Sequence, residues 1–153
     1  MIHVDKTFVP IVEALREVVT SMSGESPIVV VGGIEQSELT VVIELSGEPG
    51  VRVWLSAGVD SLGGLYEMAM GWVPDDPQEI EDFLGELANQ TLGPAAILLP
   101  GVDPNSLTIP RMVESWNPEK CWQIRGNGYR FSLGAGRDSA ANQSQACVSA
   151  GAV

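Results

Sequence analysis

The sequence predicts an α+β fold in which a mixed, largely antiparallel β-sheet packs against two long helices. Three features predict it: two amphipathic helical patterns, apolar runs typical of strands, and turn motifs that join neighbouring strands into hairpins. Each long helical pattern precedes a set of strands, which suggests an internal duplication. The 153 residues, 44% of them hydrophobic, are enough for one domain with a real core.

The first part of the chain predicts a helix followed by three strands. Across residues 7–22 apolar side chains recur every three or four positions, and Gly24 suits the left-handed conformation that ends a helix. Residues 28–34 form a nearly continuous β-branched run, which predicts a strand covered on both faces. Residues 39–45 and 51–57 alternate around a Gly-Glu-Pro-Gly turn, which predicts a hairpin.

A short helix is expected next. Ser61 is a suitable N-cap for it, and apolar side chains follow on one side despite two glycines that each cost about 1 kcal/mol relative to alanine. Met68 and Met70 fall within this helix. An adaptable binding surface is one interpretation of these methionines, but we expect them to fill the core.

The second long helix has a clear start. Asp76 is a suitable N-cap, Pro77 fits the first turn, and Glu79 is placed for a capping box. Pro94 is expected to stop or kink this helix, because proline cannot donate the backbone hydrogen bond. The sequence leaves open whether residues 95–99 resume the helix or lie extended.

The last strands follow a loop. Residues 107–113 predict an extended segment at a sheet edge, since Pro110 is poorly suited to a central strand. Residues 120–125 and 129–133 flank a Gly-Asn-Gly turn and predict a second hairpin.

The composition changes after this hairpin. From residue 134 the chain is rich in Ala, Ser, Gln, Asn and Gly, and it cannot bury enough apolar surface to offset the entropy of ordering. We therefore expect a domain over residues 1–133 and a flexible low-complexity tail over residues 134–153.

The charge and composition exclude several classes of function. A net charge of −12, from 20 acidic and 8 basic residues, argues against binding to nucleic acid or to an anionic membrane. No apolar run approaches the ~20 residues needed to span a bilayer, and residues 1–22 lack the pattern of a signal peptide, so we expect a cytoplasmic protein. Cys121 and Cys147 lack metal-ligand spacing and are expected to be reduced thiols. His3 is the only histidine and lies beside the N-terminus, which disfavours a mechanism with a buried histidine base.

Asp82, Glu86 and Asn89 are the candidate site residues, because they share one face of the second long helix. At about 100° of rotation per residue, the pattern Asp-x-x-x-Glu-x-x-Asn places them and Gly93 within a sector of roughly 60°. An acid and an amide one turn apart can bind a cation and orient a water molecule when another molecule docks on this face. The opposite face is apolar and comprises Ile80, Phe83, Leu84, Leu87 and Thr91.

This motif, on a capped helix between a helix-strand unit and later extended segments, resembles the CheC/CheX/FliY family of chemotaxis phosphatases. The similarity is greatest to the CheX-like branch, which has a single active motif. It covers residues 5–133 in element order, and residues 106–110 also look like the segment before the closing strands of the family. The resemblance implies a hydrolase of two-component signalling that removes the phosphoryl group from the aspartyl phosphate of a CheY-like response regulator.

The resemblance also implies roles for the motif. Glu86 would dock to the lysine of the phosphorylated receiver domain, Asn89 would orient the attacking water, and Asp82 would support substrate binding. No cofactor would be bound by this chain, since the magnesium ion belongs to the partner receiver domain. Relatives further suggest a homodimer joined through sheet edges, for which the segment near Pro110 offers an edge.

Other interpretations remain open at this stage. Glu86 and Asn89 are also compatible with an ordinary solvated helix surface, or with a non-catalytic receiver-binding or scaffold domain similar to the FliM middle domain. A small-molecule pocket lined by Trp54, Tyr66 and Trp72 is a further hypothesis, for which core packing of the three aromatics is the better interpretation. The first long helix has no matching pair of Glu and Asn, so a single site is expected.

Overall fold

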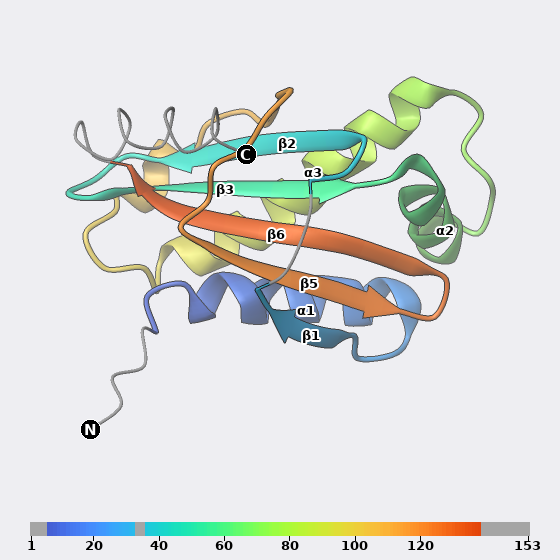
Figure 1. Ribbon diagram of the computed structural model, residues 1–153, viewed down its shortest axis with the longest axis horizontal. Coiled ribbons are helices and arrows are strands. Elements are labelled where there is room, and N and C mark those ends of the chain that lie inside the picture. Colours follow the sequence, from blue (N-terminus) through green and yellow to red (C-terminus); the bar gives the residue numbers. More distant parts are fainter. Residues whose placement is uncertain (1–5, 33–35, 139–153) are drawn as a thin grey trace.

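The structure, a computed structural model, describes residues 6–32 and 36–138, and this part contains three α-helices and one six-stranded sheet (Figure 1). The predicted α+β architecture is confirmed. The helices are α1 (Val9–Ser23), α2 (Val59–Met70) and α3 (Pro77–Ala96), with a short 3-10 helix, η1 (Pro104–Ser106). The strands are β1 (Ile28–Val31), β2 (Leu39–Leu45), β3 (Gly50–Ala57), β4 (Arg111–Met112), β5 (Lys120–Gly126) and β6 (Tyr129–Asp138).

The strand order supports the duplication suggested by the sequence. The order is β1-β5-β6-β3-β2-β4, and all neighbouring strands are antiparallel. The unit α1-β1-β2-β3 corresponds to α3-β4-β5-β6, because the first strand of each unit pairs with the middle strand of the other. The third strands, β3 and β6, pair at the centre of the sheet, from Gly50 with Asp138 to Ala57 with Phe131.

Helices α1 and α3 lie against one face of this sheet, behind it in the view of Figure 1. Their apolar faces and the inward side chains of the strands form the main core, in which the fully buried residues include Ile11, Leu15, Ile43, Leu55, Leu84, Leu87 and Leu133. Each such side chain stabilises the fold by about 1.5–3 kcal/mol relative to an exposed position. Within the described residues, no helix is both long enough and apolar enough to cross a membrane.

Strand β1 differs from its predicted environment. The apolar run predicted a strand covered on both faces, but β1 has β5 as its neighbour and forms one edge of the sheet. Ile28 is exposed, and Val31 is 75% exposed. The prediction was wrong because apolar character reports only a tendency to be buried, whereas the pairing of strands across the sheet decides which strand lies at the edge.

Helix α2 begins earlier than predicted. It starts at Val59 after Gly58, and the Ser61 hydroxyl accepts a hydrogen bond from the backbone N–H of Arg130 (3.2 Å) instead of capping the helix. Met68 and Met70 are exposed, so the expectation that they fill the core was wrong. The buried side of α2 consists of Leu62, Leu65 and Tyr66.

The outer face of the sheet is more buried than strand alternation predicts. Trp54 and Ser56 lie outside the main core, yet both are buried. The connection from β4 to β5 crosses this face (Figure 1) and is held by Gln36, whose side-chain oxygen accepts a hydrogen bond from the backbone N–H of Trp116 (3.1 Å). Trp116 lies against Gly134 of β6, so the connection shields the face from water.

The second hairpin is confirmed, but its second strand is longer than predicted. Strand β6 continues five residues beyond Leu133, and Ala135 is fully buried opposite Val53 of β3. The strand therefore extends past residue 133, where the domain was predicted to end. Residues 139–153 of the predicted tail lie outside the described residues.

Candidate functional site

Helix α3 carries the candidate site, and local contacts fix where it begins. The Asp76 carboxylate accepts a hydrogen bond from the Glu79 N–H (3.1 Å), which confirms the predicted N-cap. The Glu79 carboxylate accepts hydrogen bonds from the Asp75 N–H (2.9 Å) and from the Tyr66 hydroxyl (3.3 Å). In the standard capping box it would accept from the N–H of the N-cap, Asp76, so here it bonds the residue before the N-cap. Burial raises the pKa of Tyr66, and the nearby Glu79 carboxylate raises it further.

Pro94 does not stop α3. The helix passes through Gly93 and Pro94 and ends at Ala96, with turns over residues 97–99. Pro94 is exposed, so its ring does not disturb the buried side of the helix. Asn89 therefore lies within continuous helix, more than one turn from the C-terminal end of α3.

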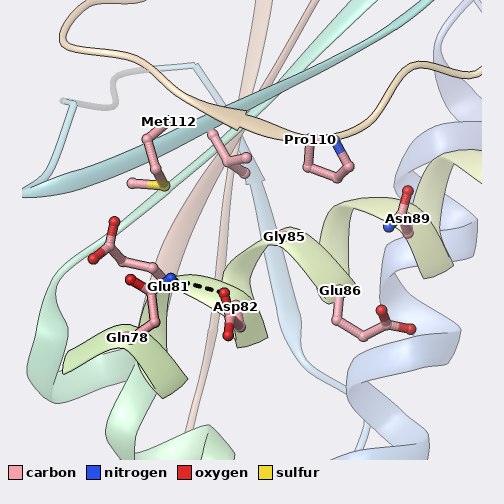
Figure 2. A pocket seen from close by; sticks show the side chains of 9 residues that line it. Gln78, Glu81, Asp82, Gly85, Glu86, Asn89, Pro110 and Met112 are labelled. Atoms are coloured by element: carbon pink, nitrogen blue, oxygen red, sulfur yellow. Dashed lines mark hydrogen bonds between the residues drawn. The ribbon is translucent and has the colours of Figure 1, made fainter. Parts of the chain in front are cut away.

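Asp82, Glu86 and Asn89 line one groove with a volume of about 300 Å³ (Figure 2). The groove lies between α3 and the segment that leads into β4. The structure thus brings the three predicted residues to one surface, as the helical spacing predicts. The other lining residues are Val41, Gln78, Glu81, Gly85, Pro110 and Met112.

The two carboxylates have weak partners within their own helix. The Gln78 side-chain N–H donates to Asp82 Oδ1 (2.9 Å), and the Gln90 side-chain N–H donates to Glu86 Oε1 (3.0 Å). Asp82 and Glu86 are exposed. Contacts of this kind contribute only about 0.2–0.5 kcal/mol on a helix surface, so a cation from a partner can replace the amide with little loss.

Asn89 is half-buried, and its side-chain amide has no hydrogen bond to any residue that the structure describes. The amide carries both donors and an acceptor. It therefore retains its full capacity to bind a water molecule or a partner group at the groove.

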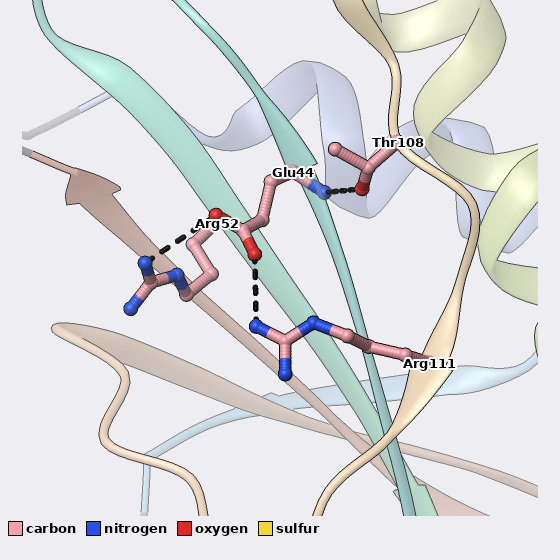
Figure 3. A network of polar contacts seen from close by, with 4 residues as sticks. All are labelled: Glu44, Arg52, Thr108 and Arg111. Atoms are coloured by element: carbon pink, nitrogen blue, oxygen red, sulfur yellow. Dashed lines mark hydrogen bonds and ion pairs between the residues drawn. The ribbon is translucent and has the colours of Figure 1, made fainter.

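The segment on the opposite side of the groove, which leads into β4, is held against strand β2 at the edge of the sheet. Arg111 and Met112 pair with β2, and the Glu44 N–H donates to the Thr108 hydroxyl (2.9 Å). The Glu44 carboxylate accepts from Arg111 (3.1 Å) and from Arg52 (3.3 Å), as Figure 3 shows. These contacts fix the position of the segment relative to α3.

The groove can bind and orient, but its lining contains no strong nucleophile. Its polar side chains are carboxylates and amides, with no Ser, Cys, Lys or His among them. Across the described part of the chain, no group of three or more His, Cys, Asp or Glu residues is arranged to hold a metal ion. Cys121 lies on β5, and burial raises the pKa of its thiol. The carboxylates and amides of the lining are suited to bind and orient a docked molecule.

Sequence reasoning missed several residues of the site. Gln78 and Gln90 lie four residues from Asp82 and Glu86, a spacing at which helical side chains meet, so this signal was present in the sequence. Pro110 and Met112 carried no such local signal, because their place beside α3 depends on the pairing of β4 with β2.

The predicted aromatic pocket does not form. Trp54 lies on the outer face of the sheet, Tyr66 lies in the main core, and Trp72 is exposed. Core packing, the preferred interpretation, is therefore confirmed for Tyr66, and Trp54 is also buried, although on the outer face of the sheet; for Trp72 it was wrong.

Comparison with known proteins identifies the fold. No protein-family model matches the chain, and no curated protein matches its sequence. A CheX chemotaxis protein from Desulfovibrio desulfuricans is similar in structure, with a TM-score of 0.70 and 16% identity over 88% of this chain and 100% of that one. A CheC-like superfamily protein from Shewanella sp. PV-4 gives a TM-score of 0.73 and 14% identity over 89% of this chain and 100% of that one.

A third similar structure contains a partner. The complex of CheX with CheY, BeF3 and Mg2+ from Borrelia burgdorferi gives a TM-score of 0.67 and 14% identity, over 90% of this chain and 100% of the matched chain. The chain thus has the fold of CheX and CheC-like chemotaxis proteins, as its motif led us to expect.

Proposed function

We propose that this chain, on the fold it shares with CheX, is a CheX-like phosphatase that accelerates dephosphorylation of a CheY-like response regulator. The observation that carries the proposal is the shared groove of Asp82, Glu86 and Asn89, with the Asn89 amide unpaired among the described residues. The Borrelia CheX structure was determined with CheY, which supports a receiver domain as the partner.

The proposed reaction is hydrolysis of the aspartyl phosphate on the receiver. The Asn89 carbonyl oxygen accepts a hydrogen bond from water, and this orients the water oxygen for in-line attack on phosphorus. As the new P–O bond forms, the bond from phosphorus to the aspartate oxygen breaks. The aspartate leaves as a carboxylate with the bonding electron pair, and both protons of the water remain on the inorganic phosphate, as H2PO4−. Phosphoryl transfer requires mainly positioning and charge stabilisation, and the receiver-bound magnesium ion supplies the latter.

Glu86 is proposed to anchor the receiver. Among the residues that the structure describes, its exposed carboxylate is bonded only to Gln90 of the same helix, so the lysine of a receiver can pair with it at small cost. Asp82 lies one turn earlier on the same face and adds negative charge along the docking surface.

The decisive experiment follows the decay of aspartyl phosphate on receivers encoded in the same genome. We expect wild-type protein to accelerate decay, Asn89→Ala to abolish the acceleration, and Glu86→Lys to weaken docking. Asn105→Ala and Glu17→Lys are matched controls, because they make the same chemical changes at exposed positions outside the groove. Unchanged decay with wild-type protein would end the phosphatase proposal, and receiver binding without accelerated decay would favour the non-catalytic alternative.

A further inference from the structure

Pro110 and Met112 form an apolar wall of the groove opposite α3, and an exposed isoleucine directly precedes them in the chain. We call residues 109–112 the lip. Pro110 and Met112 of the lip line the groove, and Figure 2 shows both side chains along α3. Met112 is 39% exposed, and Ile109, immediately before Pro110, is 87% exposed.

Backbone contacts hold the lip on both sides of Ile109. The Thr108 N–H donates to the Glu44 carbonyl (3.0 Å), and Arg111 and Met112 pair with β2. Pro110 also lies against α3, since a Cβ added at Gly85 would be 3.5 Å from Pro110 Cβ. A single exposed apolar side chain is ordinary on a protein surface. An apolar residue whose backbone is held on both sides is different, because little backbone entropy is lost when a partner covers it.

The two walls of the groove differ in chemistry. Glu81, Asp82 and Glu86 place carboxylates on the α3 side, whereas Pro110 and Met112 make the other side apolar. A molecule that fits both walls must present a basic group next to an apolar surface. The segment near Pro110 was also expected to offer an edge for a homodimer, but a second copy carries a net charge of −12 and would bring like charge to the acidic wall. A partner with a basic group therefore matches the groove better.

We propose that the lip is a second docking contact for the receiver and selects receivers that carry an apolar surface beside the basic group bound by Glu86. This inference rests on the proposed function, since it takes the receiver as the occupant of the groove. The lip contributes affinity and specificity, whereas Asn89 provides the catalytic group. Replacement of the apolar side chains of the lip therefore raises KM and leaves kcat unchanged.

The test compares the double variant Ile109→Ser/Met112→Ser with Val31→Ser. Val31 is a matched control, because it is an exposed apolar residue on the edge strand at the opposite side of the sheet. Binding is measured by calorimetry with candidate receivers loaded with beryllofluoride and Mg2+, and KM and kcat are measured by phosphate release. Ile109→Ser alone is included because Ile109 is so exposed that its replacement leaves folding intact.

We expect the double variant to raise Kd and KM at least tenfold, on the order of one buried large apolar side chain, with kcat unchanged. Val31→Ser leaves both values as in wild type. Added salt should weaken wild-type binding through the acidic wall and leave the fold-change caused by the lip variant unaltered.

Three results would overturn the proposal. If the Kd of the double variant is within twofold of the wild-type value, the lip does not contact the receiver. This result refutes the lip proposal alone, because wild-type protein can still be an active phosphatase. If sedimentation shows that wild-type protein is a dimer and that Ile109→Ser is a monomer, the lip is a contact between two copies of the chain and not a contact with the receiver. Failure of wild-type protein to bind any loaded receiver rejects the lip together with the proposed function.

Discussion

The substitution Gly85→Ala separates the stability of α3 from the shape of the groove. Glycine in a helix interior costs about 0.8–1.0 kcal/mol relative to alanine. A Cβ at position 85 would lie 3.5 Å from Pro110 Cβ and 3.9 Å from Pro110 Cγ, which are ordinary contacts. The variant should therefore be more stable by about 1 kcal/mol, which raises the melting temperature by about 2–4 °C for a chain of this size.

Gly63→Ala in α2 is the matched control. A Cβ at position 63 has nothing within 4 Å, so the same gain in stability is expected without any contact to the groove. Thermal unfolding measures the gain, and a time course of receiver dephosphorylation measures the proposed phosphatase activity. Because Gly85 lines the groove between Asp82 and Asn89, its new methyl group should slow dephosphorylation, whereas Gly63→Ala should not.

The two readouts of Gly85→Ala test different parts of the reasoning. A lower melting temperature would show that α3 and Pro110 are packed more tightly than the 3.5 Å contact allows. A higher melting temperature with unchanged dephosphorylation would show that no receiver atom approaches the helix at Gly85. Equal slowing by Gly63→Ala would attribute the effect to stability and not to the groove.

Three further predictions concern the fold. Gly64→Ala should lower the melting temperature although alanine favours helix, because its Cβ would lie 2.8 Å from the carbonyl oxygen of Gly128; a rise would contradict this contact. Asp76→Ala should lower the free energy of unfolding in urea by about 1 kcal/mol through loss of the cap to Glu79, and an unchanged midpoint would refute the cap. Burial raises the pKa of Tyr66 above 10.0, so the unfolded chain releases the phenol proton first and stability should fall as the pH rises above 10.0. Urea unfolding between about pH 9 and 11 should show a smaller fall for Tyr66→Phe, and an equal fall would assign the effect to other groups.

The parts of α3 that the sequence predicted correctly depend on local geometry. The N-cap at Asp76 involves residues three positions apart, and the common face of Asp82, Glu86 and Asn89 follows from the helical repeat. The same holds for the αL residue Gly24 after α1. Local patterns of this kind are encoded within a few residues, so they can be read without knowledge of the fold.

The largest errors involve contacts between distant parts of the chain. The sequence of β1 predicted a buried strand, but the strand order of the sheet places it at an edge. The end of β6 has few large apolar side chains, so it resembled the tail in composition. Its small residues are required there, because a Cβ at Gly134 would lie 2.8 Å from Pro118 Cβ. The lip is likewise invisible in the sequence, since it reaches α3 only through pairing with β2.

The duplicated topology explains why the fold alone does not specify the site. Helices α1 and α3 begin equivalent units and pack side by side on the sheet, so either offers a scaffold for a docking face. On α1, however, Glu13 is followed three residues later by Arg16, and Glu17 by Thr20. The Thr20 hydroxyl donates to the backbone carbonyl of Arg16 (2.7 Å), so it does not replace a free amide. A single proposed site per chain thus follows from the side chains on one of two similar helices, and the fold supplies only their support.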